Sequence, residues 1–231
     1  MRNNFELTLF EDSAELVISA ANEALALIVR LLADKKVFHI ALTGGPLGTE
    51  FAEKLVELMN GAGDLKGLNI WFSDERFDTT DSPLRNSRPV RDGLKNSSIT
   101  VHEVASTDDE VSVFEAAQSY EAQLRGLTMD LCILGLGFDG HVASLFPEHW
   151  SSQATDAAIA VVDSPKPPAE RVTFSMAFIN SSEQVWIIAS GKIKAAAAKA
   201  VIEADASVPA GHVQAAGLTR LLLDSEAFSN E

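Results

Sequence analysis

Hydrophobic positions along the chain alternate between strand-like and helix-like spacing. Residues 5–10 alternate apolar and polar side chains, as an edge strand does, and residues 13–33 carry apolar residues at helical spacing behind a capping Asp12. Further strands are expected at residues 37–42, 68–72, 99–104, 131–134, 157–162, 172–175, 185–189 and 218–223, and further helices at 49–60, 87–94, 108–125 and 191–204. This alternation predicts one α/β domain over residues 1–231, a Rossmann-like, doubly wound, mostly parallel sheet with helices on both faces.

Length and composition fit an ordinary globular protein. The 231 residues are 46% hydrophobic and 22% charged, and no uninterrupted apolar run approaches the roughly 20 residues that cross a bilayer. Residues 1–7 lack the apolar core of a secretory signal. The one cysteine, Cys132, lies in an apolar run, which indicates core packing and a reducing compartment. We therefore expect a cytoplasmic protein.

The net charge limits the partners of the protein. A formal charge of −15 argues against nucleic acid and against an anionic membrane, because both require a basic surface. A small anionic ligand remains compatible with this charge if a few cations converge on one pocket. Since the chain has only 18 lysines and arginines, each one that lies near the end of a predicted strand is a candidate for binding such a ligand.

A glycine-rich segment follows the predicted strand at residues 131–134. It fits the G-x-G-x-x-G pattern of dinucleotide-binding proteins through Gly135, Gly137 and Gly140. That function requires a long helix after the glycines and an acidic residue at the end of the next strand. Here Pro147 interrupts the helix, and Asp156 precedes the next apolar run instead of ending it. A dinucleotide site is therefore disfavoured, and no organic cofactor is expected.

Asp139 and His141 stand within this glycine-rich turn. Ligands of open α/β sheets bind at the carboxyl ends of strands, so a histidine placed there is a candidate catalytic group. A neutral imidazole acts as a general base near physiological pH, and the spacing permits Asp139 to orient the ring. No other His or Cys lies at metal-ligand spacing around His141, so no metal site is expected. The other histidines are less informative: His39 and His102 lie in predicted strands, and His149 and His212 lie in polar loops without an identifiable partner.

Two other segments follow predicted strands. The turn Thr43-Gly44-Gly45 joins a strand to a helix, where converging backbone N–H groups favour an anion. No Gly-Lys-Ser/Thr follows, so a nucleotide triphosphate is not expected, and a tight turn without a ligand remains an alternative. Asp74 and Arg76 follow another strand and form either a structural ion pair or part of a site.

Two cations outside these segments are also candidates. Arg171 lies at the start of a strand after a proline-rich loop, and Lys194 lies at the start of a helix after a glycine. Each is either a solvated surface cation or a group that meets an anion. Together with Arg76 they are the obvious partners for a negatively charged ligand.

These segments together resemble the glucosamine-6-phosphate isomerase/6-phosphogluconolactonase family over almost the whole chain. Residues 134–147 resemble the lactonase signature G-x-G-x-[DE]-G-H-x-x-S-L-F-P, and residues 74–76 resemble its D-E-R, where deaminases of the family tend to carry D-E-Y. Residues 164–173, 190–195 and 208–210 resemble its S-P-K-P-P…R-[IV]-T, G-x-x-K-A and late L/V-P-A segments.

The sequence departs from the family pattern in two loops. The first glycine loop of the family usually reads S-G-G-S-T-P, and here Pro46-Leu47-Gly48 replaces S-T-P. Two hydroxyl groups are therefore missing, for which Thr43 and Thr49 are possible substitutes beside the backbone N–H groups. The loop after Arg76 lacks the usual V-P and D-S-N, and Asn86 is the best match for that asparagine.

The resemblance implies hydrolysis of a small phosphosugar lactone, 6-phosphoglucono-1,5-lactone, without metal or cofactor, by a monomer or small homo-oligomer. It implies His141 as the general base, oriented by Asp139. The implied substrate-binding residues are Thr43, Gly44, Gly45, Asp74, Arg76, Asn86, Gly137, Arg171 and Lys194. One alternative is a glucosamine-6-phosphate deaminase, which Arg76 in place of tyrosine disfavours. Another is a sugar-phosphate sensor without catalysis, which the presence of His141 disfavours.

Overall fold

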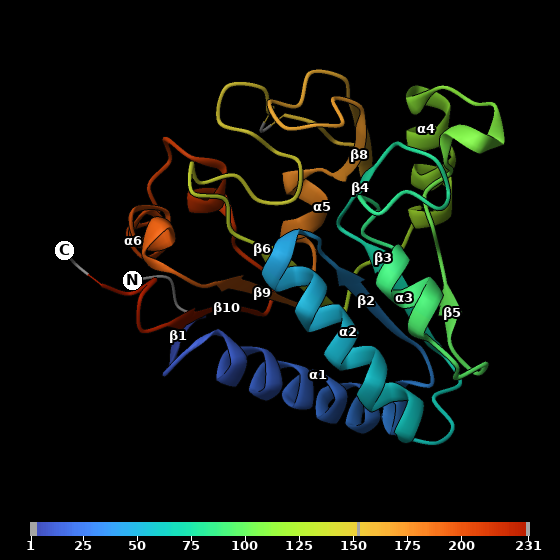
Figure 1. The fold of residues 1–231 in the computed structure, drawn as a ribbon, viewed down its shortest axis with the longest axis horizontal. Helices are drawn as coiled ribbons and strands as arrows, with labels where there is room; N and C mark the ends of the chain where they lie inside the picture. Colours follow the sequence, from blue (N-terminus) through green and yellow to red (C-terminus); the bar gives the residue numbers. More distant parts are fainter. Residues whose placement is uncertain (1–3, 152, 230–231) are drawn as a thin grey trace.

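A parallel sheet forms the centre of the protein. The structure, a computed structural model, describes residues 4–151 and 153–229. Seven strands lie in the order β1-β10-β9-β6-β2-β3-β5, and every neighbouring pair is parallel (Figure 1). Their bounds are β1 Phe5–Phe10, β2 Phe38–Leu42, β3 Leu68–Phe72, β5 Thr100–Val101, β6 Leu131–Gly135, β9 Gln184–Ala189 and β10 Leu218–Asp224. The predicted parallel sheet is confirmed.

A second, smaller sheet was not included in the prediction. It consists of β4 (Asp74–Arg76), β8 (Arg171–Phe174) and β7 (Ala158–Val161), paired antiparallel in the order β4-β8-β7. The connection from β7 to β8 is only residues 162–170. Parallel neighbours require a crossover of about a dozen residues or more, so this short connection favours an antiparallel pair.

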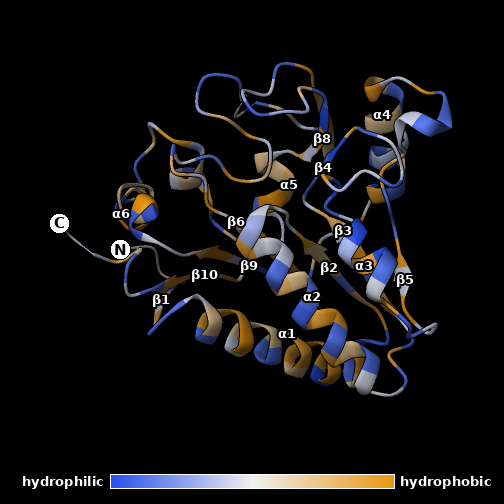
Figure 2. Cartoon of the chain, viewed as in Figure 1, coloured by the Kyte–Doolittle hydropathy of each residue, from blue (hydrophilic) through white to orange (hydrophobic). Residues whose placement is uncertain are grey.

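Helices cover both faces of the central sheet, as the alternating pattern predicts. Their bounds are α1 Ser13–Lys35, α2 Gly45–Gly61, α3 Arg88–Gly93, α4 Val113–Leu124, α5 Met176–Asn180 and α6 Ala195–Glu203. On one face, α1 and α2 pack in a buried cluster that includes Ile28, Leu55 and the strand residue Ile40. On the other face, α4, α5 and α6 share a cluster with the small sheet, including Tyr120 and Phe174. Figure 2 shows the central strands mostly in hydrophobic colours between these layers.

Helix α1 is long and apolar enough, by length and composition alone, to cross a membrane. Its residues Leu16, Ala20, Ala24 and Ile28 are buried against the sheet and α2. The helix begins behind Asp12, whose carboxylate accepts the N–H of Glu15 at 2.9 Å, as the sequence predicts. The core helix of a globular protein passes the same length and composition test, and the buried face of α1 packs as such a helix does, while Ile18 and Val29 on its other face are exposed.

Several boundaries differ from prediction for local reasons. Helix α2 begins at Gly45 instead of residue 49, because proline is tolerated in the first helical turn at position 46. The predicted helix over residues 108–125 is interrupted at Glu110, which has a φ of 57°, and restarts at a capping box between Ser112 and Glu115. The strand expected over residues 99–104 is reduced to β5, and the helix expected from residue 191 opens with a 3₁₀ turn over Lys192–Lys194.

The order of strands reverses between β2 and β6. The chain continues from β2 to its neighbour β3 on one side, and from β6 it later reaches β9 on the other. The connections after β2 and β6 therefore diverge and leave a crevice at the carboxyl ends of these two strands. The loop after β6 and the loop between β7 and β8 lie together beyond this edge (Figure 1).

Candidate active site

A cleft of about 420 Å³ occupies this crevice. Most of the predicted site residues line it: Thr43, Gly44, Gly45, Asp74, Arg76, Gly137, His141, Arg171 and Lys194. Asp139 and Asn86 do not line the cleft, but each hydrogen-bonds to a residue that does. Lys166, which the prediction did not single out as a site residue, also lines it.

The first wall is the turn from β2 into α2. The hydroxyl of Thr43 accepts the backbone N–H of Gly135 at 3.2 Å, which ties this turn to the end of β6. A Cβ atom at Gly44 would overlap the side chain of Asn86, so the backbone passes there only because residue 44 is glycine. The turn aims the N-terminus of the 17-residue helix α2 at the cleft, which favours a bound anion.

The second wall is the turn after β6, which folds back on itself. Gly137 N–H donates to the carbonyl of His141 at 2.8 Å, and Gly140 has a φ of 83°. The Nδ1–H of His141 donates to the carboxylate of Asp139, so Nε2 is the unprotonated ring nitrogen of the neutral imidazole. A Cβ at Gly137 would overlap both the imidazole and this carboxylate. The turn therefore holds an oriented histidine at the cleft wall.

The surroundings of His141 keep its imidazole neutral. Burial lowers the pKa of His141, and the nearby positive charge of Lys166 lowers it further, while Asp139 and Asp74 act in the opposite direction. Burial alone would raise the pKa of Asp139, but the charge and hydrogen bonds of His141 bring it below its ordinary value. The pair is therefore a neutral base beside an ionised carboxylate near neutral pH.

Asp74 forms the floor of the cleft with little exposure to solvent. Its carboxylate accepts the hydroxyl of Ser144 at 2.8 Å and the side-chain amide of Asn86 at 3.0 Å. The same amide donates to the backbone carbonyl of Asp74 at 2.7 Å. Asn86 thus supports the position of Asp74, while the guanidinium Nη1 of Arg171 lies 3.9 Å from its carboxylate.

Arg171 is only 3% exposed, and most of its guanidinium donates hydrogen bonds to carbonyls of the proline-rich loop. Its Nε donates to the carbonyl of Pro168 at 3.1 Å and its Nη2 to the carbonyl of Lys166 at 2.8 Å. Nη1 is 3.4 Å from the hydroxyl of Ser144. Most of the guanidinium therefore holds the loop that presents Lys166 to the cleft.

Lys194 extends from the 3₁₀ turn after β9. Its Nζ donates to the backbone carbonyl of Leu136 at 2.7 Å, and burial is the main cause that lowers its pKa. The preceding turn is fixed by the buried carboxylate of Asp224, which accepts the N–H of Gly191 at 3.0 Å and the hydroxyl of Ser190 at 2.5 Å. Lys194 is therefore held at the cleft by two different strand ends.

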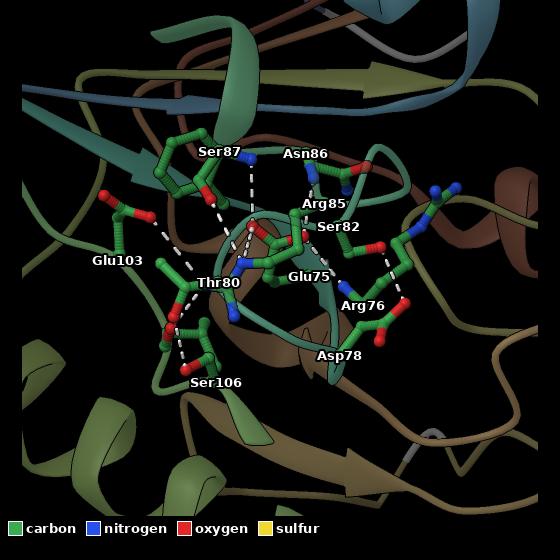
Figure 3. A network of polar contacts seen from close by, with 12 residues as sticks. Glu75, Arg76, Asp78, Thr80, Ser82, Arg85, Asn86, Ser87, Glu103 and Ser106 are labelled. Carbon is green, nitrogen blue, oxygen red and sulfur yellow. Dashed lines mark hydrogen bonds and ion pairs between the residues drawn. The ribbon is translucent and has the colours of Figure 1, made fainter. Parts of the chain in front are cut away.

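A buried carboxylate that the sequence did not reveal organises the wall behind Arg76 (Figure 3). Glu75 is fully buried and accepts the N–H groups of Arg76, Asn86 and Ser87 at 2.8, 2.6 and 2.9 Å. Burial raises its pKa, and Arg85, 3.7 Å away, is the largest opposing influence. The adjacent acid and base in the sequence gave a signal for an ion pair, but the cation that pairs with Glu75 is Arg85.

The remaining candidate groups have packing roles or a single partner. His39 accepts the indole N–H of Trp71 at 3.0 Å, and His102 stacks on the same indole. Cys132 is buried, as predicted, and burial raises its pKa. His149 has a partner that the sequence did not indicate, the carboxylate of Asp163 at 2.9 Å, and His212 Nε2 lies 2.9 Å from the carbonyl of Ala206. Among residues 4–151 and 153–229, no three or more His, Cys, Asp or Glu side chains form a group that could hold a metal.

Comparison with curated proteins shows relatives along the full chain. The protein is 35% identical over 255 aligned positions to "Probable 6-phosphogluconolactonase 2" of Oryza sativa subsp. indica, covering 99% of this chain and 90% of the relative. It is 31% identical over 249 positions to the 6-phosphogluconolactonase of Streptomyces coelicolor, covering 99% and 95%.

Solved structures give the same fold. The structure of a 6-phosphogluconolactonase from Thermotoga maritima matches with a TM-score of 0.82 at 27% identity, over 96% of this chain and all of the other. A structure titled as a monomeric glucosamine-6-phosphate deaminase matches with a TM-score of 0.76 at 20% identity, over 96% and 98%, which shows the shared fold. Residues 11–222 match the family described as "Glucosamine-6-phosphate isomerases/6-phosphogluconolactonase". The chain belongs to this family of glucosamine-6-phosphate isomerases and 6-phosphogluconolactonases.

Proposed function

We propose that this protein is an enzyme that hydrolyses 6-phosphoglucono-1,5-lactone to 6-phosphogluconate, the second step of the oxidative pentose phosphate pathway. The observation that carries the proposal is the His141–Asp139 pair in a cleft lined by Arg76 and Lys194 at the switch point of the sheet. The full-length similarity to proteins named 6-phosphogluconolactonase supports it.

In this reaction, water attacks the ring ester carbonyl, C1 of the lactone. Nε2 of His141 takes a proton from the water as the new C–O bond forms, and Asp139 keeps Nδ1 protonated and stabilises the imidazolium. The carbonyl electron pair moves to oxygen. When it returns, the bond between C1 and the ring oxygen breaks, and the imidazolium gives its proton to that leaving oxygen. The product acid then loses a proton to solvent.

The substrate phosphate requires convergent donors, because the chain as a whole is strongly acidic. The N-terminus of α2 with the Thr43-Gly44-Gly45 backbone, and the cations Arg76, Arg171 and Lys194, supply them. Within the first turn the donors of this arrangement are backbone N–H groups, so it needs no hydroxyls at the positions of Pro46-Leu47-Gly48. Asp74, which Asn86 and Ser144 hold in place, is suited to accept a sugar hydroxyl, and Gly137 leaves room beside the imidazole.

The test compares two reactions on the purified protein. We expect hydrolysis of 6-phosphoglucono-1,5-lactone above the spontaneous rate, measured as 6-phosphogluconate formed, and no ammonia from glucosamine 6-phosphate. Ammonia release without lactonase activity would identify a deaminase, and binding of the phosphosugar without turnover would identify a sensor. Either result would overturn the proposal.

We also infer that residues 1–231 act as one domain in the cytoplasm, as a monomer or small homo-oligomer without a nucleic-acid or membrane partner. The net charge of −15 argues against a nucleic-acid or anionic-membrane partner, and the cleft has a volume suited to a small molecule. Two rice relatives are named as chloroplastic proteins.

A further inference from the structure

We propose that the ammonium group of Lys166 stabilises the negative charge that develops on the lactone carbonyl oxygen beside His141. This makes Lys166 a second catalytic residue, distinct from the cations that hold the phosphate. The inference rests on the proposed lactonase function and assigns a role to Lys166, which lines the cleft together with Lys194.

The backbone of Lys166 is fixed independently of its side chain. The hydroxyl of Ser164 donates to the carbonyl of Lys166 at 2.9 Å and accepts its N–H at 3.3 Å. The guanidinium of Arg171 donates to the same carbonyl at 2.8 Å. These contacts place the lysine side chain over the cleft, and a substitution of that side chain leaves them in place.

Among residues 4–151 and 153–229, no carbonyl or carboxylate accepts a hydrogen bond from the ammonium of Lys166, whereas Lys194 and Arg171 have such acceptors. Within the described part of the chain, the recorded contact of this ammonium is with the face of the Phe138 ring, whose centroid lies 5.3 Å from Nζ. Lys194 already donates to the carbonyl of Leu136, and Arg171 to the carbonyls of the proline-rich loop. Lys166 therefore has all three N–H donors available for a ligand oxygen.

Lys166 lines the same cleft as His141, Lys194 and Arg76, and the pKa shifts of these groups are consistent with that placement. After burial, the positive charge of Lys166 is the largest cause that lowers the pKa of His141. The same holds for the lowered pKa of Lys194. The pKa of Lys166 itself is lowered chiefly by burial, while Asp139 raises it and both Arg171 and Arg76 lower it. The ammonium thus lies among the base and the other cations of the cleft.

A cation in this place serves the first step of the reaction. As water adds to C1, the carbonyl electron pair moves to oxygen, and the N–H groups of Lys166 donate to that oxygen without giving up a proton. When the pair returns, the ring C–O bond breaks and the hydrogen bonds weaken. The interaction is strongest in the transition state, so its loss lowers kcat more than it raises KM.

The test is Lys166→Met, which keeps a long unbranched side chain and removes its charge. Loss of one oxyanion donor typically costs about 10²–10³-fold in kcat. We expect a loss of that size for 6-phosphoglucono-1,5-lactone and for unphosphorylated gluconolactone alike. The matched control is Lys192→Met, an exposed lysine that does not line the cleft, and it should retain wild-type kinetics.

A second readout is the pH profile of Lys166→Met. Since Asp139 and Asp74 also face His141 and raise its pKa, removal of the opposing lysine charge should move the acid limb of kcat/KM to higher pH. A loss confined to KM for the phosphorylated lactone would overturn the inference and make Lys166 a phosphate ligand. Unchanged kinetics would also overturn it. A wild-type protein without lactonase activity would instead overturn the proposed function.

Discussion

The two glycine-rich turns of the cleft follow neighbouring parallel strands but contribute different chemistry. The turn after β2 runs directly into the long helix α2 and presents backbone N–H groups. The turn after β6 folds back through Gly137 and Gly140 and presents the side chain of His141. Under the proposed function, a turn that works through its backbone should tolerate altered side chains such as Pro46-Leu47-Gly48, whereas a turn that works through one imidazole should not.

The sharpest test of this difference removes the imidazole. We expect His141→Ala to lower kcat by about 10²–10⁴-fold, the usual contribution of a general base. The side chain lies at the cleft wall, so the variant should fold like the wild type, which circular dichroism and a thermal melt can check. A folded variant with near-normal lactonase activity would exclude His141 from the mechanism.

Gly137→Ala tests the second turn without removing a functional group. The new methyl group would overlap the imidazole of His141 and the carboxylate of Asp139. Displacement of a catalytic group by about 1 Å can cost 10²-fold, so we expect a drop in kcat of about that size. The matched control is Gly61→Ala, at the end of α2, where a Cβ meets nothing within 4 Å. Equal activity of the two variants would show that the turn adapts around the new methyl group.

The two turns also differ in how far the sequence predicted them. Local spacing permits the Asp139–His141 pairing, and the structure shows this hydrogen bond. The support of the first turn comes from far along the chain: Gly44 is glycine because Asn86 packs against it, and Glu75 holds Asn86. Such contacts depend on the second sheet, in which β4 pairs with β8. The spacing of hydrophobic residues along the chain does not predict that pairing.

The fold itself was largely predictable, because alternating strands and helices impose a parallel sheet with two covered faces. Strand positions held well where apolar runs were continuous, as in β3 and β9. Prediction failed where polar contacts decide the ends, as at the Ser112 capping box. The place of Lys166 in the cleft was not predicted either, because it depends on hydrogen bonds to Ser164 and Arg171 within an irregular loop, which leave no periodic pattern in the sequence.

The next largest effect is expected on KM, when a cation proposed to bind the substrate phosphate is removed. Lys194→Ala should mainly raise KM for the phosphorylated lactone, by about tenfold. Removal of one partner costs about 2–5 kcal/mol in a buried charge pair and about 1 kcal/mol or less in an exposed one; Lys194 is half-buried, and 1.4 kcal/mol is tenfold. Turnover of unphosphorylated gluconolactone should change little. Lys192→Ala, which removes an exposed cation from the same turn, is the control. Equal losses on both substrates would show that Lys194 does not bind the phosphate.

Arg171→Ala should behave differently from Lys194→Ala. Because Arg171 holds the carbonyls of Pro168 and Lys166, its loss should raise KM and also lower kcat through a displaced Lys166. A raised KM with kcat unchanged would limit Arg171 to the phosphate. The ratio of kcat values for Arg171→Ala and Lys166→Met therefore measures how far the loop depends on this one guanidinium.

The pH profile is the smallest effect and bears directly on the second turn. The neutral imidazole is the active form, so activity is complete above the pKa of His141 and is lost as the pH falls through it. Burial and Lys166 lower that pKa, so the acid limb of kcat/KM should lie below the ordinary value of 6.5. Unphosphorylated gluconolactone is the substrate to use, because a phosphate group titrates near pH 6 and would overlap the limb. Spontaneous hydrolysis must first be subtracted. An acid limb above pH 6.5 would then mean that Asp139 raises the pKa of His141 by more than burial and Lys166 lower it. A flat profile from pH 4.5 to 8 would mean that the second turn supplies no titrating base.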